Sequence, residues 1–272
     1  MKSKFISLPY IIWTLAFIVI PLGMVVYFAL TTENGTFTFS NITELFQPQY
    51  GHVFFLSLRL AVVATIVCFI IGYPLAFILS KAKPVAQRTM VMLIMLPMWM
   101  NFLLRTYAWM TILENNGLLN KLFGLIGLGP FKMINTEGAV VLGMVYNFLP
   151  FMVLPLYTIM LKIDSSVIEA AQDLGANSVR VLGRVIFPLS LPGIISGVTM
   201  VFVPSVSTFI ISQMLGGGSN LLIGDLIQAQ FIGNSYNPRL GSAMSLILML
   251  VILLVMGVIN RMDDEDKEGM LI

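Results

Sequence analysis

The stretch from Asp164 to Gly193 decides the fold, and it reads DSSVIEAAQDLGANSVRVLGRVIFPLSLPG. It is a polar interval between two long apolar runs. Within it, Ser166 and Glu169 have the spacing of a capping box, in which the two side chains satisfy free backbone N–H groups at the start of a helix. Gly175 suits the left-handed position that ends a helix. The interval therefore predicts a short helix that stops at Gly175.

A second short helix is predicted directly after the glycine. Asn177 or Ser178 can accept a hydrogen bond from the first turn of this helix. In the first helix, Val167, Ala171 and Leu174 recur at helical spacing and form one apolar stripe. Two helical turns are not stable alone in water. The stripe of this helix–glycine–helix elbow therefore predicts a partner protein that covers it.

Working outward from the elbow, the composition requires a membrane. The chain has 272 residues, of which 58% are hydrophobic and 10% are charged, and its mean hydropathy is +0.93. Soluble domains carry about 25% charged residues. A helix needs about 20 apolar residues to cross a bilayer. Six stretches meet that length, near residues 8–30, 54–80, 89–113, 138–161, 190–214 and 241–260.

Prolines occur in most of these stretches. A proline frees a backbone carbonyl inside a helix, which a neighbouring helix, water or local unwinding must satisfy. The pattern predicts bent helices around a wet pathway, with kinks that serve packing alone as the alternative. The prolines concerned are Pro21, Pro74, Pro97, Pro150, Pro155 and Pro204.

The distribution of lysine and arginine predicts that both termini are cytoplasmic, since basic loop residues favour that side. With this orientation only Lys121, Lys132 and Arg239 lie outside. Arg59 and Arg105 fall within apolar stretches. The inner side carries Lys2, Lys4, Lys81, Lys83, Arg88, Lys162, Arg180, Arg184, Arg261 and Lys267.

Several function classes are excluded by what the chain lacks. It has no basic stripe for nucleic acid. With one cysteine, Cys68, and one histidine, His52, it offers no cysteine–histidine metal site. It contains no G-x-x-x-x-G-K-[ST] loop for ATP and no G-x-S-x-G or H-E-x-x-H motif. No catalytic residue and no cofactor are expected in this chain.

The elbow resembles the EAA loop of bacterial ABC importer permeases. The match comprises Glu169-Ala170-Ala171-x-x-x-Gly175 and, after nine intervening residues, Val185-Ile186-Phe187-Pro188. In that family the short helix docks in a groove of a cytoplasmic ATPase, where ATP and Mg²⁺ bind. The resemblance implies that ATPase coupling is carried by Glu169, Ala170, Ala171, Asp173, Gly175 and Pro188.

Almost the whole chain resembles the B-type permeases of spermidine/putrescine importers. The matching segments are Gly72-Tyr73-Pro74, Leu96-Pro97-x-Trp99-x-Asn101-x-x-x-Arg105-x-Tyr107, Leu149-Pro150-Phe151-Met152-Val153-x-Pro155-Leu156-Tyr157, Glu169-Ala170-Ala171-x-Asp173-Leu174-Gly175-Ala176 and Gly216-Gly217-x-x-Asn220-Leu221-Leu222-Ile223-Gly224.

This resemblance implies an all-α, multi-pass protein of the bacterial inner or plasma membrane, with six transmembrane helices in the type I ABC importer fold. Residues 1–52 would form a first helix and outer loop. Residues 53–262 would form a five-helix core that includes the coupling loop 162–189. Residues 263–272 would form an acidic cytoplasmic tail. The implied partners are an ATPase dimer, a second, C-type permease, an extracytoplasmic binding protein and the polyamine.

A polyamine path should offer carboxylates, carbonyls and aromatic faces. No Asp or Glu lies in the middle of a predicted span, and Glu114 and Asp225 stand at the outer edge. Relatives often carry an acid where this chain has Gln213. Much of the negative charge is therefore expected from the second permease. The candidate pathway residues are Trp99, Asn101, Tyr107, Tyr146, Asn147, Gln213 and Asp225.

Two alternatives stay open at this point. The same permease role for another small solute, such as an amino-acid derivative or a metal chelate, fits the shared motifs equally well. A secondary transporter or channel would carry an intramembrane acid or a selectivity filter, and the sequence has neither.

Overall fold

The computed structural model describes residues 8–218, 220–233 and 235–269, with the backbone alone for 260 and 262–269. The described chain is helical throughout, apart from one isolated bridge between Thr31 and Phe37. The predicted all-α class is confirmed. The basic residues Lys2 and Lys4 lie outside the described residues, as does the end of the acidic tail.

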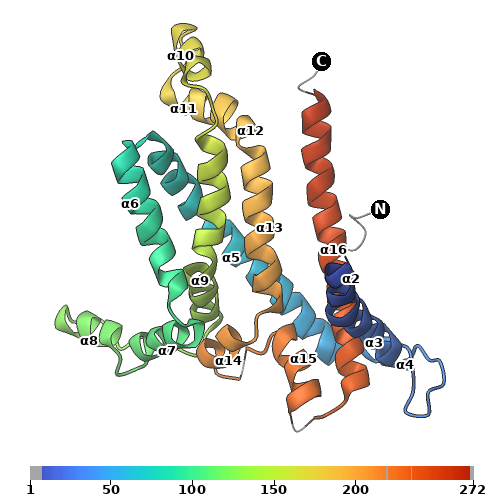
Figure 1. Ribbon diagram of the computed structural model, residues 1–272. Helices are drawn as coiled ribbons and strands as arrows, with labels where there is room; N and C mark the ends of the chain where they lie inside the picture. Colours follow the sequence, from blue (N-terminus) through green and yellow to red (C-terminus); the bar gives the residue numbers. More distant parts are fainter. Residues whose placement is uncertain (1–7, 219, 234, 270–272) are drawn as a thin grey trace.

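The helices follow one another with short connections (Figure 1). They are α2 (Leu8–Thr14), α3 (Ile20–Ala29), α4 (Ser40–Glu44), α5 (Pro48–Lys81), α6 (Pro84–Met95), α7 (Phe102–Leu113), α8 (Leu118–Leu125), α9 (Glu137–Met160), α10 (Ser165–Asp173), α11 (Ser178–Val181), α12 (Phe187–Leu189), α13 (Leu191–Ser207), α14 (Ile210–Gly216), α15 (Ile223–Ile232) and α16 (Pro238–Gly269).

Four helical stretches are long and apolar enough to cross a membrane without a break: 8–29, 48–81, 137–160 and 238–259. Two further pairs of helices pass the same test together but are bent. The pair Pro84–Trp99 and Phe102–Leu125 bends by 90°, and the pair Ser178–Leu189 and Leu191–Ser207 bends by 69°. Counting each bent pair as one span gives the six that the sequence predicts.

The predicted continuous span 89–113 is wrong. Helix α6 tightens into a 3₁₀ turn at Leu96–Trp99, and α7 restarts at Phe102 in a new direction. The side chain of Asn101 accepts hydrogen bonds from the N–H groups of Leu103 at 2.8 Å and Leu104 at 3.3 Å. An N-terminal cap of this kind allows a helix to begin inside an apolar stretch.

The predicted span 190–214 is also wrong at its outer end. Helix α13 ends at Ser207, Thr208 is extended with φ −65° and ψ 144°, and α14 begins at Ile210. Pro204, three residues before the end, lacks the N–H that would hold the preceding turn. The break separates Gln213 from the span in which the sequence places it.

Proline does not end every helix that contains it. Helix α5 continues through Pro74, and α9 continues through Pro150 and Pro155. Single π-helical turns, Leu15–Val19 and Leu182–Ile186, instead stand immediately before Pro21 and Pro188. A π turn widens the helix and gives the ring room. Proline therefore does not interrupt the helical assignment of α5 or α9.

Helices α5, α9 and α13 form the central bundle (Figure 1). Gly197 of α13 lies so close to α9 that an added Cβ would stand 3.2 Å from the Met152 carbonyl oxygen. Small residues at helix contacts allow such close packing in membranes. A second cluster joins α16 to α15 and to the outer half of α5. Arg239 of α16 donates to the Thr31 carbonyl at 2.9 Å, which holds the loop after α3.

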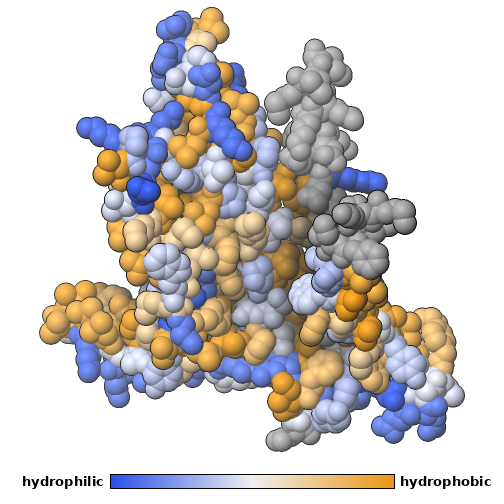
Figure 2. All heavy atoms as spheres, in the orientation of Figure 1, coloured by the Kyte–Doolittle hydropathy of each residue, from blue (hydrophilic) through white to orange (hydrophobic). Residues whose placement is uncertain are grey.

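Hydrophilic side chains gather around α10 at one end of the molecule and along the edge at the other (Figure 2). Many apolar side chains between these ends are exposed, among them Phe55, Ile66, Ile70 and Leu253. Exposed apolar side chains on long helices suit a lipid surrounding.

The turn after α14 generates a prediction about stability. Gly217 and Gly218 have φ values of +62° and +74°, but only at Gly217 would a Cβ meet the Asn135 side chain, 2.2 Å from its Oδ1. We expect Gly218→Ala to cost about 1 kcal/mol of left-handed strain, and Gly217→Ala to cost about 2–4 kcal/mol because Asn135 must also move. Thermal unfolding of the purified protein in detergent measures both, and equal losses would contradict the packing role.

Candidate functional site

The predicted residues lie in two groups at opposite ends of the bundle (Figure 1). The elbow, made of α10 and α11, forms one end. Helices α7, α14 and α15 lie at the other end. We call it the outer end because the lysine and arginine distribution predicts that this end faces away from the cytoplasm. The central helices join the two groups.

Helix α10 is capped by a residue that the sequence analysis did not choose. Asp164 precedes the helix, and its Oδ1 accepts a hydrogen bond from the Ser166 N–H at 3.0 Å. This hydrogen bond lowers the pKa of the Asp164 carboxyl. The predicted capping box of Ser166 and Glu169 is wrong because the helix begins two residues earlier, at Ser165, so both side chains stand within it.

The other end of α10 is as predicted. Gly175 has φ +83°, and its N–H donates to the Gln172 carbonyl at 2.8 Å. The N–H of Ala176 donates to the Ala171 carbonyl at 3.0 Å. Together these bonds form a Schellman motif. Asn177 then caps α11 by accepting from the Arg180 N–H at 2.9 Å, which settles the choice between Asn177 and Ser178.

The elbow presents apolar side chains to its surroundings. Ile168 points back and shares a small cavity with Met160 and Ile186 of the bundle. Val167 is exposed, and Leu174 is 90% exposed. The stripe that the sequence predicts is therefore uncovered within the described chain. Glu169, Ala170 and Asp173 are exposed on the same short helix, Ala171 is half-buried there, and Pro188 is half-buried at the start of α12.

At the outer end, Asp225 is a buried carboxylate, 4% exposed, in the first turn of α15. Its Oδ2 accepts from the Leu222 N–H at 2.7 Å, and its Oδ1 has no partner. Burial raises the pKa of this carboxyl. Ser212 and Gln213 lie near enough to offset part of that rise, although neither makes a hydrogen bond to Oδ1.

The broken end of α13 lies directly beside Asp225. A Cβ added to Gly224 would stand 2.6 Å from the Ser207 carbonyl oxygen and 2.5 Å from that of Thr208. The last carbonyls of a helix carry its partial negative charge. A buried carboxylate and the carbonyl end of a half-helix therefore come together, as they do where broken membrane helices bind cations.

Gln213 joins this group through a residue that the sequence analysis missed. Its side-chain amide donates to Oε1 of Gln228, so α14 and α15 are tied together. Gln228 lies three residues after Asp225, on the same side of a helix. This three-residue spacing could have identified Gln228 from the sequence, provided that residues 223–232 were recognised as helical.

The remaining predicted pathway residues surround α7. Trp99 is 71% exposed before the bend, Asn101 caps α7, and Tyr107 is exposed on it. Tyr146 of α9 packs against Trp109 of α7, with 5.4 Å between the ring centroids. Of these residues, Tyr146 makes a side-chain contact between α7 and α9.

Asn147 faces the interior instead. It is 2% exposed, and its Nδ2 donates to the Gly143 carbonyl of the same helix at 2.8 Å, while its Oδ1 has no partner.

The two arginines in apolar stretches differ in environment. Arg59 of α5 forms an ion pair with Glu137 at the start of α9. Arg105 is 8% exposed, lies over the Phe102 ring at 5.8 Å, and has no hydrogen-bond partner at Nε or Nη1. Arg59 is thus paired within the chain, which the sequence analysis did not foresee.

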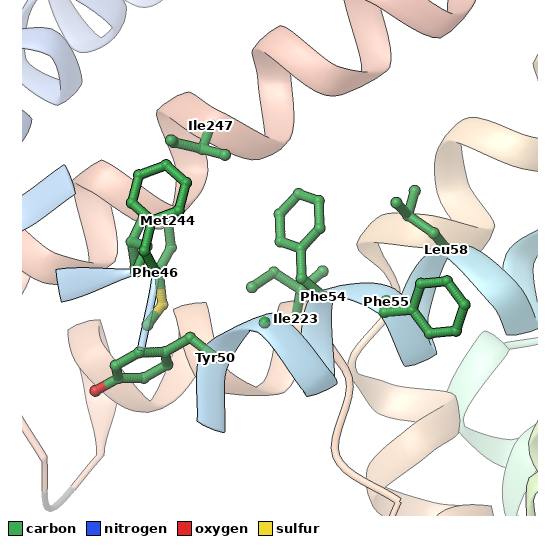
Figure 3. A pocket seen from close by; sticks show the side chains of 10 residues that line it. Phe46, Tyr50, Phe54, Phe55, Leu58, Ile223, Met244 and Ile247 are labelled. Carbon is green, nitrogen blue, oxygen red and sulfur yellow. The ribbon is translucent and has the colours of Figure 1, made fainter. Parts of the chain in front are cut away.

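A cavity of about 310 Å³ lies among the outer ends of α5, α15 and α16 (Figure 3). Its walls are aromatic and aliphatic, with Phe46, Phe54 and Met244 around it and the Tyr50 hydroxyl at the rim. It offers no carboxylate, so it is unsuited to a polycation. Among the described residues no group of three or more His, Cys, Asp or Glu side chains could hold a metal ion.

Comparisons with known proteins agree with this architecture. Residues 68–265 match the family of binding-protein-dependent transport system inner membrane components. The spermidine/putrescine transport system permease protein PotB of Haemophilus influenzae is 39% identical over 257 residues, which cover 92% of this chain and 90% of that protein. The protein of the same name from Escherichia coli K12 is 36% identical over 247 residues, 88% of this chain and 90% of that one.

Two solved structures share the fold. A bacterial ABC transporter involved in the import of the acidic polysaccharide alginate superposes with a TM-score of 0.81 at 17% identity, covering 96% of this chain and 94% of that one. The MetNI methionine ABC transporter gives 0.59 at 18% identity, covering 79% and 94%. With the family model matching well over half of its length, the chain belongs to the binding-protein-dependent transport system inner membrane components, the multi-pass permease subunits of bacterial ABC importers.

Proposed function

We propose that this chain is the membrane-spanning permease of an ATP-driven importer that carries polyamines, spermidine or putrescine, from an extracytoplasmic binding protein into the cytoplasm. The relatives with 36–39% identity over most of the chain are named for that transport. The chain has no catalytic role of its own. ATP and Mg²⁺ belong to a partner ATPase.

The observation that carries this proposal is the unpartnered Oδ1 of buried Asp225, whose neighbour Gly224 packs against the carbonyls of Ser207 and Thr208. A buried carboxylate without a counter-charge is costly. An ammonium group would supply both the charge and the hydrogen bonds. The exposed aromatic rings of Trp99 and Tyr107 offer faces for further cationic groups.

The coupling role rests on the uncovered stripe of α10. Leu174 and Val167 are exposed apolar side chains on a helix that is rigidly capped at both ends. Such a helix suits a hydrophobic groove on a partner. With the elbow on the ATPase side, both termini are cytoplasmic. The division into a first helix and outer loop (1–52), a core (53–262) and a tail (263–272) follows the same scheme.

A second, C-type permease completes the pathway in this proposal. A spermidine molecule carries up to three positive charges, and this chain supplies one buried carboxylate at the outer end. Further negative charge comes from the partner permease. ATP binding draws the two coupling elbows together and opens the spans outward, and hydrolysis returns them. The membrane potential assists with about 2.3 kcal/mol per charge per 100 mV.

The substrate assignment is tested at Asp225. Asparagine keeps an oxygen that can accept from the Leu222 N–H but removes the charge. Loss of a charged hydrogen bond costs about 1.5–3 kcal/mol, so Asp225→Asn is expected to raise the KM for spermidine by roughly 10- to 100-fold. Uptake of labelled spermidine by cells that lack the native gene measures this, with putrescine and an unrelated amino acid as competitors.

The matched control is Glu33→Gln, which removes an exposed carboxylate from the outer loop 31–47. It should leave the KM unchanged. Competition by the amino acid rather than by putrescine would show that the importer carries another solute. An Asp225→Asn variant that assembles and transports with the wild-type KM would refute the role of this carboxylate.

The coupling assignment is tested at Leu174. Because this side chain is 90% exposed, Leu174→Asp should fold normally. Loss of a buried leucine at an interface costs about 1.5–3 kcal/mol, so we expect ATPase binding to weaken by roughly 10- to 100-fold and spermidine-stimulated ATP hydrolysis to fall accordingly. Val85→Asp, at a similarly exposed apolar position in the first turn of α6, serves as control. Equal behaviour of the two variants would argue against docking through α10.

A further inference from the structure

A polar cavity of about 380 Å³ opens at the outer end, where α7 meets α14. Four polar side chains line it, from Glu114, Asn115, Asn116 and Asn135. The rest of the wall is apolar and consists of Met110, Ile134 and Met214. This mixture of one carboxylate, amide groups and aliphatic side chains differs from the wholly apolar cavity near α16.

The chain builds one wall of this cavity from the end of α7. Gly117 turns back so tightly that a Cβ would stand 2.5 Å from the Ile112 carbonyl oxygen and 2.6 Å from that of Thr111. The N–H of Gly117 donates to the Glu114 carbonyl at 2.8 Å, and Asn120 donates to the same carbonyl at 3.2 Å. The Glu114 backbone is therefore fixed at the negative end of a helix.

The opposite wall is held by a residue in an uncommon conformation. Asn135 has φ +62°, its N–H donates to the Leu215 carbonyl at 2.9 Å, and its own carbonyl accepts from Asn220 at 3.3 Å. Gly217 packs directly against its side chain. Asparagine tolerates this left-handed conformation, and here its hydrogen bonds tie the loop before α9 to the end of α14.

The charge in this cavity is uncompensated within the described chain. The Glu114 side chain has no hydrogen bond or ion pair with any described residue, and neither Lys121 nor Lys132 of the same outer segment forms a salt bridge with it. A single carboxylate is too few for a divalent metal, which takes several oxygen ligands. A primary ammonium group, with three donors and one charge, matches a carboxylate and amide oxygens.

We propose that this cavity is an outer receiving site for one terminal ammonium group of an alkyl polyamine. Glu114 neutralises the charge, the asparagines accept hydrogen bonds, and Met110, Ile134 and Met214 contact the methylene chain. Met214 follows Gln213 on α14, so the same short helix contributes to the receiving site and to the group around Asp225. This inference rests on the proposed polyamine transport.

Glu114→Gln tests the site because it keeps the size and polarity of an exposed side chain and removes its charge. The complete transporter, reconstituted in proteoliposomes with its ATPase, second permease and binding protein, is assayed for labelled spermidine uptake. Loss of one charge-assisted contact predicts a KM about tenfold higher. The matched variant Glu33→Gln should keep the wild-type KM.

A labelling experiment measures occupancy of the cavity independently of transport. The chain has one cysteine, Cys68, and it is buried, so Asn116→Cys introduces an accessible thiol at the cavity. Its modification by the cationic reagent methanethiosulfonate-ethyltrimethylammonium should slow several-fold when spermidine is added. The protection should disappear in the double variant that combines Asn116→Cys with Glu114→Gln. Sodium at equal ionic strength should not protect the thiol.

The outcomes separate the two proposals. If the wild-type transporter takes up spermidine while Glu114→Gln keeps the wild-type KM and Asn116→Cys is not protected, the receiving site is refuted and the transport function stands. If the wild-type transporter takes up no spermidine, the proposed function fails. Protection of Asn116→Cys by spermidine would in that case still identify an ammonium site at Glu114.

Discussion

The structure depends on one constraint, that no backbone N–H or carbonyl can be left without a partner in hydrocarbon. Continuous helices meet it by themselves, but each break in a span needs a substitute. At 100–101 the side chain of Asn101 satisfies the first turn of α7. At the start of α15 the Asp225 carboxylate accepts from Leu222. Both of these capped helix starts lie at the outer end, where the proposed solute site also lies.

The central bundle and the two ends have different physical roles. Helices α5, α9 and α13 approach closely at small residues such as Gly197 and behave as one packed unit. The elbow is fixed to that unit through Ile168 and through the π turn before Pro188. After the turn at Gly175–Asn177, the helix α11, the π turn and α12 follow one another and meet α13 at a bend of 69°. The break at Ser207, at the far end of the same helix, lies beside Asp225, so one helix connects the elbow to the buried carboxylate.

Much of this could be predicted from the sequence, and the failures have definite causes. Hydropathy found every span but no break, because residues 102–113 and 210–216 are as apolar as the helices before them. Asn101 was visible as a polar residue in an apolar run, and reading it as a cap would have predicted the bend. The capping box at Ser166 failed because Asp164, also a strong cap residue, stands two positions earlier. Neither the pair Gln213–Gln228 nor the approach of Ser207 to Gly224 could be predicted, since both depend on how α14 and α15 fold back.

The scarcity of acidic residues suits a path for polyvalent cations. A site with several carboxylates would hold spermidine tightly, and release would then limit the rate, whereas transport needs binding strong enough for entry and weak enough for exit. This chain offers single carboxylates at separate places, Glu114 in an open cavity and Asp225 buried at a helix break. Each can meet one ammonium group at a time, and the methylene chain between ammonium groups can lie along Met110 and Met214. On the proposed path, moving from an exposed to a buried carboxylate would exchange water for protein oxygens in two steps, so that the cation would keep some of its partners throughout.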